Sequence, residues 1–154
     1  MESKSSRLDM FDRRPGLKRT RLRESQINLF VLLARELQDA WRRAPHLPMS
    51  SRPEYRRFID GAYACAFVTN DFGNDGRLAG GVSYERVQDN PRILQDCTLQ
   101  TIRHVAHTLV RADHWNSQAT DDEDVGVINR ALASGLVTEV ANRLDAIRQA
   151  APFD

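Results

Sequence analysis

Three of the four histidines lie in one stretch, residues 98–116, with the sequence TLQTIRHVAHTLVRADHWN. His104 and His107 are three residues apart, so on a helix their imidazoles could share a metal ion. A zinc site needs three or four ligands, and Asp113, His114 or the run Asp121–Glu123 would have to supply the others. Because this spacing matches no established metal motif, we expect no bound metal and no cofactor.

Other catalytic signals are missing from the sequence. The chain has no phosphate-binding loop, no GxGxxG, no HExxH and no GxSxG. Cys65 lies in AYACAF, an apolar setting that predicts a small core residue, not a nucleophile. Cys65 and Cys97 form no CxxC, the N-terminus is polar, and no run is long enough to cross a membrane. We therefore expect a cytoplasmic protein without enzymatic activity and without a membrane partner.

The stretch that holds the histidines has the periodicity of an amphipathic helix. One side carries the apolar residues Leu99, Ile102, Ala106, Leu109 and Val110. The other side carries Arg103, His104, His107 and Arg111. We predict a core helix over about residues 97–112, with Asp96 as its N-cap and an aromatic turn at Trp115. The polar side would form an outward basic face available for binding, and Trp115 would be either a core or an interface aromatic residue.

Charge is unevenly distributed along the chain. The net charge is only +1, but residues 1–23 carry eight basic and three acidic side chains, or +5, which leaves −4 for the remainder. We predict a flexible basic arm over residues 1–23 and a helical domain over residues 24–154. The arm is either a solvated tail or a contact to phosphate or to an acidic protein. Its candidate binding residues are Arg13, Arg14, Lys18, Arg19, Arg21 and Arg23.

Helical periodicity accounts for most of the remaining sequence. The predicted helices cover residues 24–43, 53–67, 97–112, 121–134 and 137–150, and residues 82–87 are predicted to form a short helix or a turn. Capping boxes that begin at Ser51 and Thr120 would start two of them, and Gly135 would end one. No stretch alternates as a strand would. The fold class predicted is therefore all-α, a single compact bundle of five or six helices.

From Tyr55 onward four segments follow one another within about residues 55–148: FIDGAYACAFV, DNP, TLQTIRHVAHTLVRADHW and ALASGLVTEVANRL. Their order resembles a bacterial family, the domain of unknown function DUF6508. The sharpest match is LVRADHW at residues 109–115, and the departure from the family pattern is His114-Trp115, where the family has Arg-Phe. The resemblance implies no assigned activity, no catalytic residue and no ligand.

A helical body with a basic arm and no catalytic motif favours a binding function. We expect a small inhibitor or regulator that occupies the surface of a protein or nucleoprotein complex, such as an anti-CRISPR protein from a phage or another mobile element. A nucleic-acid-binding accessory protein that uses the arm and the face formed by Arg103, His107 and Arg111 is the alternative. A metal-dependent hydrolase is a third hypothesis, and a homodimer is compatible with each of them.

Overall fold

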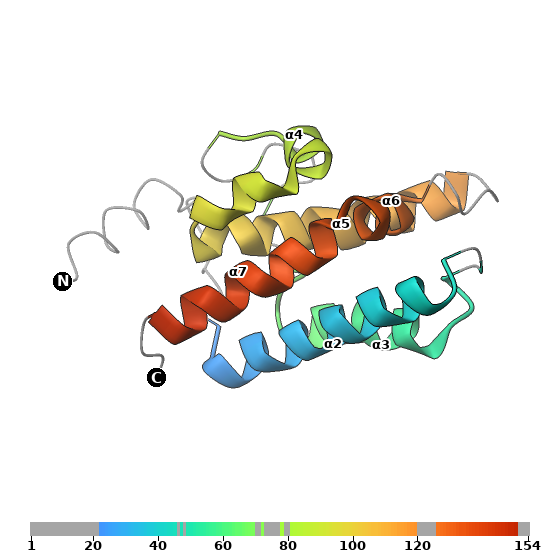
Figure 1. Cartoon of the computed structure of the whole chain (residues 1–154), viewed down its shortest axis with the longest axis horizontal. Helices are drawn as coiled ribbons and strands as arrows, with labels where there is room; N and C mark the ends of the chain where they lie inside the picture. Colours follow the sequence, from blue (N-terminus) through green and yellow to red (C-terminus); the bar gives the residue numbers. More distant parts are fainter. Residues whose placement is uncertain are drawn as a thin grey trace.

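Every regular element in the described part of the chain is a helix (Figure 1). The computed structural model describes residues 22–45, 47, 49–69, 72, 78, 81–119 and 126–150, without the side chains of residues 114–119. The elements are α2 (Glu24–Arg43), α3 (Pro53–Ala64), α4 (Tyr84–Asp89), the 3-10 helix η1 (Pro91–Asp96), α5 (Leu99–Ala119), α6 (Val127–Ser134) and α7 (Leu136–Ala150). Those ranges contain no strand, which confirms the all-α prediction.

The helices form a bundle in which α5 occupies a central position. Helix α2 packs against α3 on one side and α7 on the other, while α5 contacts α3, α6 and α7 (Figure 1). The short elements α4 and η1 contact each other and cover α6 and α7 respectively. The apolar side of α5 is thereby enclosed by other helices, as its periodicity predicts.

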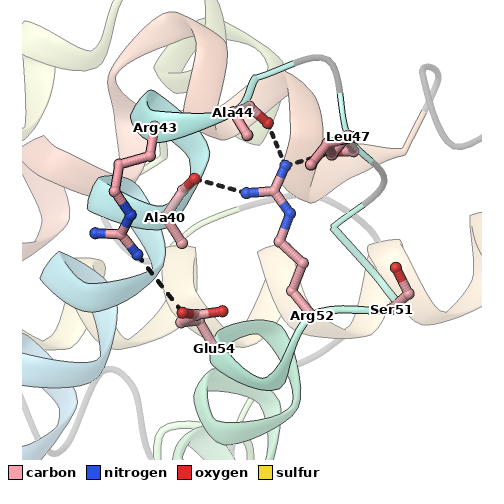
Figure 2. Close-up of a pocket in the computed structure, with 7 residues that line it drawn as sticks. All are labelled: Ala40, Arg43, Ala44, Leu47, Ser51, Arg52 and Glu54. Carbon is pink, nitrogen blue, oxygen red and sulfur yellow. Dashed lines mark hydrogen bonds and ion pairs between the residues drawn. The ribbon is translucent and has the colours of Figure 1, made fainter.

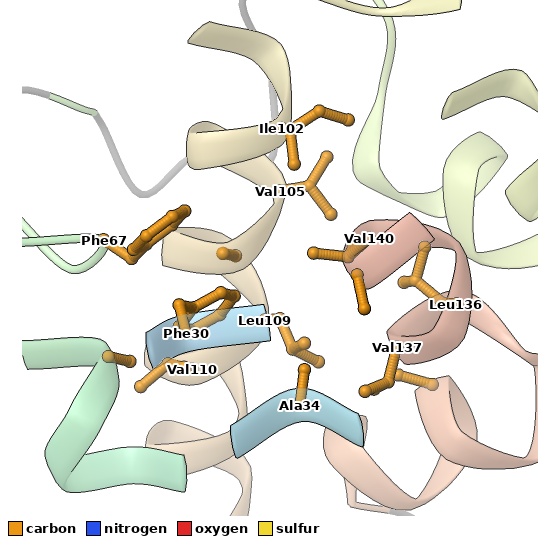
Figure 3. Packing of buried hydrophobic residues seen from close by; sticks show 14 of the residues in the cluster. Phe30, Ala34, Phe67, Ile102, Val105, Leu109, Val110, Leu136, Val137 and Val140 are labelled. Atoms are coloured by element: carbon orange, nitrogen blue, oxygen red, sulfur yellow. The ribbon is translucent and has the colours of Figure 1, made fainter. Parts of the chain in front are cut away.

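The core forms where α2, α5 and α7 meet (Figure 3). Phe30 of α2 stacks on Phe67 with ring centroids 4.0 Å apart and packs against Phe58 of α3 at 5.3 Å. Leu109 of α5 and Val137 of α7 are almost fully buried within the same cluster. Cys65 is also buried there, which confirms its expected place in the core.

Helix α2 has the predicted bounds, but a distant side chain closes its C-terminal end. The guanidinium of Arg52 donates to the carbonyl oxygens of Ala40 at 2.6 Å, Leu47 at 2.8 Å, and Ala44 (Figure 2). Arg52 also holds the N-cap position of α3, since Pro53 is the first helical residue. The predicted capping box at Ser51 is therefore wrong by one residue.

Helix α3 ends before the predicted residue 67 because the chain turns left-handed at Ala66, with φ of 64°. The N–H of Phe67 donates to the carbonyl of Ala62 at 2.9 Å, and the N–H of Ala66 donates to that of Tyr63 at 3.2 Å. These two bonds are the Schellman pattern, which glycine usually completes. An alanine in this position gives no sequence signal for a helix end.

Three other boundaries test the sequence predictions. Thr98, and not Asp96, accepts the N–H of Thr101 at the start of α5, because Asp96 already belongs to η1. Helix α5 continues to Ala119 where a turn at Trp115 was expected. Gly135 ends α6 with φ of 87°, as predicted. The capping box predicted at Thr120 lies outside the described residues.

Two substitutions near the end of α3 should change stability in opposite directions. Ala66→Gly should raise the free energy of unfolding by about 1 kcal/mol, because glycine adopts a left-handed conformation without the Cβ penalty. Ala64→Gly, two residues earlier in the exposed last turn of α3, should lower it by about 1 kcal/mol through the poor helix propensity of glycine. Urea denaturation measures both. Destabilisation by Ala66→Gly would contradict the left-handed assignment.

Candidate functional site

The polar side of α5 is covered by protein. Arg103, His104 and His107 are only 2%, 6% and 3% exposed. The predicted outward basic face is therefore wrong for these three residues. These residues are buried because the segment after α3 lies against this side of α5. Its described residues, 66–69 and Phe72, form the cover of α5.

Phe72 makes the aromatic part of the cover. Its ring stacks on His104 with centroids 4.5 Å apart and planes 17° apart. It contacts the His107 ring at 5.6 Å with a 58° tilt, and the guanidinium carbon of Arg103 lies 5.7 Å from its centroid. One phenyl ring therefore contacts all three buried basic side chains, and the contact with Arg103 is a cation–π interaction.

Backbone groups of the cover supply the polar contacts. Arg103 donates from Nη2 to the carbonyl oxygen of Ala66 at 3.0 Å. The backbone N–H of Thr69 donates to Nδ1 of His107 at 3.2 Å. Buried polar groups require such partners, because burial without hydrogen bonds costs free energy. These side chains thus hold the protein's own chain in place.

His104 and His107 are the pair whose spacing would allow a shared metal ion. The ring centroids of His104 and His107 lie 6.2 Å apart, and Thr69 already occupies one nitrogen of His107. Within the ranges that the structure describes, no three His, Cys, Asp or Glu side chains are grouped so that they could hold an ion.

Arg111 is the member of the predicted face that remains near the surface. It is half-buried and donates from Nη1 to the hydroxyl of Tyr63 at 3.4 Å, and Tyr63 is itself exposed. In the arm, Arg23 is exposed and precedes α2 as its N-cap residue. The other predicted arm residues, and the side chain of Trp115, lie outside the described part of the structure.

Asp113 is a buried carboxylate that connects three helices. Its Oδ2 accepts the hydroxyl of Tyr55 in α3 at 2.6 Å, and its Oδ1 accepts the N–H of Ile128 at 3.0 Å. Ile128 is the second residue of α6, so the carboxylate lies at the positive end of that helix dipole. The sequence gives no signal that Tyr55 and the start of α6 are the partners of Asp113.

Tyr84 in α4 offers a contrast to Tyr55. Its hydroxyl is buried and has no hydrogen-bond partner in the part of the chain that is described. Burial raises the pKa of this hydroxyl; the charge of Arg130 opposes the change, and that of Asp113 adds to it. Tyr84 therefore remains protonated and acts as a large core side chain.

Neither cysteine has the environment of a nucleophile. Burial raises the pKa of both Cys65 and Cys97, which disfavours the thiolate. The Sγ of Cys97 donates to the carbonyl of Ile93 at 3.3 Å.

A pocket of about 310 Å³ lies between the end of α2 and the start of α3 (Figure 2). Its charged groups interact with one another or with backbone: Arg43 is 3.6 Å from Glu54, and Arg52 binds three carbonyl groups. The other lining residues are Ala40, Ala44, Leu47 and Ser51. This pocket has the composition of a packed helix junction, and its charged groups already have ion-pair or hydrogen-bond partners within the protein.

Comparison with known proteins gives no relative: no family model, no curated protein and no solved structure matches the chain. The resemblance to DUF6508 therefore stays a prediction. None of the described helices is both long and apolar enough to span a bilayer.

Paired tyrosine substitutions test the role of Asp113. Tyr55→Phe should lower the free energy of unfolding by about 1.5–3 kcal/mol, because it removes a hydrogen bond to a buried charged group. Tyr84→Phe removes a hydroxyl without a described partner and should change stability by less than about 0.5 kcal/mol or increase it. Urea denaturation near neutral pH measures both. An equal loss of unfolding free energy in both variants would contradict the assignment of a hydrogen bond to Asp113 from Tyr55 alone.

Proposed function

We propose that this protein is a small non-enzymatic binding protein that occupies the surface of another protein through α2. The observation that carries the proposal is the exposure of two leucines on this helix. Leu29 is 45% exposed and Leu32 is 65% exposed, although α2 also supplies much of the core. Residues three apart on a helix lie side by side, so the two leucines form one apolar spot.

The two sides of α2 therefore serve different purposes. Its core-facing residues include Phe30 and Ala34, while Leu29 and Leu32 face solvent. Scattered apolar residues are common on protein surfaces, but adjacent leucines on one long helix have the spacing of anchors that enter an apolar groove. A rigid helix presents such anchors at low entropic cost, because its backbone is already ordered.

Ion pairs lie along α2 near the two leucines. Arg35 is 3.2 Å from Asp145 of α7, and Glu36 accepts two bonds of 2.9 Å from Arg57 of α3. The hydrogen bonds from Arg57 lower the pKa of Glu36, so this carboxylate stays ionised. Apolar anchors beside a polar rim are the usual anatomy of a protein interface.

The candidate catalytic and metal-binding side chains are engaged in contacts within the protein, and this also supports a binding role over an enzymatic one. Arg103, His107 and Asp113 contact the protein's own backbone or side chains, which leaves them as structural groups. An inhibitor of a nucleoprotein complex, such as an anti-CRISPR protein, is one concrete form of the proposal. The nucleic-acid alternative now depends on the arm and Arg111, because Arg103 and His107 are covered.

A charge placed on α2 tests the proposed surface. Leu32→Glu should reduce capture of the partner by about tenfold or more, since a carboxylate would be desolvated in an apolar groove. The measurement is quantitative mass spectrometry of proteins retained by the immobilised full chain from a host lysate. Leu47→Glu is the matched control, because Leu47 is a 50% exposed leucine away from this face of α2.

A partner retained by the wild type and by Leu47→Glu, but lost with Leu32→Glu, supports the proposal. Retention that is unchanged by Leu32→Glu, or reduced equally by both variants, contradicts it. Light scattering of the purified chain identifies the case in which the partner is a second copy, and Leu32→Glu would then shift a dimer to a monomer.

A further inference from the structure

The pocket between the end of α2 and the start of α3 contains a carboxylate with unused hydrogen-bonding capacity. The side chain of Glu54 is only 19% exposed, and its ion pair with Arg43 has an N···O distance of 3.6 Å. That distance is too long for a hydrogen bond. Within the described part of the chain, the Glu54 carboxylate accepts no hydrogen bond. A carboxylate can accept about four, so Glu54 can still bind a donor that enters the pocket.

Arg43 is a loosely held partner for this carboxylate. Its side chain is 67% exposed, and exposed ion pairs of this kind contribute little to stability. Arg57, another arginine near Glu54, donates two hydrogen bonds of 2.9 Å to Glu36 and is therefore already engaged. Arg43 can turn into solvent at small cost, which would leave Glu54 open to a different cation.

The other cation of the pocket, Arg52, interacts with the end of α2. Its guanidinium donates to the carbonyl oxygens of Ala40, Ala44 and Leu47 (Figure 2). The first two carbonyls lie at the C-terminal end of α2, where the helix dipole is negative and offsets the charge of Arg52. An anion that entered the pocket would meet these oxygens and the Glu54 carboxylate. A cation is therefore the better match.

The wall of the pocket provides an apolar surface next to the carboxylate. Ala40 and Ala44 line it, together with Leu47, which is 50% exposed. The volume of about 310 Å³ lies at the lower end of the range of small-molecule sites, which is about 300–1,000 Å³. An aliphatic stem could lie on this wall while a charged head reaches Glu54, as in the amphipathic side chains of lysine and arginine.

We infer that this pocket binds a small organic cation, an alkylguanidinium or alkylammonium, whose head replaces Arg43 at Glu54. The head would donate directly to the carboxylate, and such charge-assisted hydrogen bonds are shorter and stronger than the present 3.6 Å contact. The stem would cover the exposed part of Leu47. This site is separate from Leu29 and Leu32, so it does not rest on the binding function proposed for α2.

Titration of the full chain with butylguanidinium, followed by amide NMR, tests the site. The amide signals of Glu54 and Ala44 should shift along saturable curves with a Kd of roughly 1–10 mM, as expected for a ligand of this size. Butylurea is neutral and has nearly the same shape. It should bind at least about tenfold more weakly, because it forms no charge-assisted hydrogen bond.

Three substitutions locate the bound cation. Glu54→Gln should weaken the binding of butylguanidinium by about tenfold or more, since it removes the charge and keeps the shape. Arg43→Gln should strengthen binding by about threefold or more, because it removes the cation that competes for Glu54. Arg42→Gln is the matched control: it removes the same charge from the same turn of α2, where Arg42 pairs with Asp39. It should change the affinity by less than about twofold.

Equal affinities for butylguanidinium and butylurea, which are measured on the wild type alone, would overturn the inference. Equal strengthening by Arg43→Gln and Arg42→Gln would also overturn it, because binding would then reflect only the overall charge of the chain. The amide spectrum of each variant without ligand shows that the fold is retained.

Discussion

The enclosure of α5 on all sides is the constraint on which the rest of the structure depends. Every residue from 101 to 110 is buried, although this run contains an arginine, two histidines and two threonines. Hydration cannot satisfy polar groups at that depth, so the surrounding chain must supply partners. The left-handed turn at Ala66 directs its carbonyl to Arg103, and Phe72 lies across the imidazoles. The path of the chain after α3 follows from this requirement.

Sequence periodicity predicts which side of a helix is buried, and this prediction is correct for helices that bury only their apolar side. The bounds of α2, the glycine at Gly135 and the apolar side of α5 were all predictable, because each has a local pattern. Periodicity does not show whether the polar side of a helix is also covered. The described hydrogen bonds from the cover to α5 are made by backbone atoms, such as the Thr69 N–H and the Ala66 carbonyl, which have no signature in the sequence.

The same limit applies to helix ends that distant side chains close. Arg52 binds the last carbonyls of α2, and Gln38 of α2 donates from Nε2 to the carbonyl of Leu132 at the end of α6. Neither residue belongs to the helix end that it closes. Asp113 likewise caps α6 from another helix. Residues whose types suggested catalysis or binding are used here as connectors, so residue type alone could not distinguish the two roles.

The ion pairs at the outer end of α2 and α7 have a topological consequence. Arg148 near the end of α7 lies 3.6 Å from Glu24 in the first turn of α2 and 2.5 Å from Asp145, and Asp145 in turn pairs with Arg35 of α2. The first and last described helices therefore meet at one pole of the bundle (Figure 1). A circular permutant that joins these two ends by a short linker, and opens the chain in another loop, would keep the native helix contacts. The order in which the helices occur along the chain is therefore separable from the packing that they adopt.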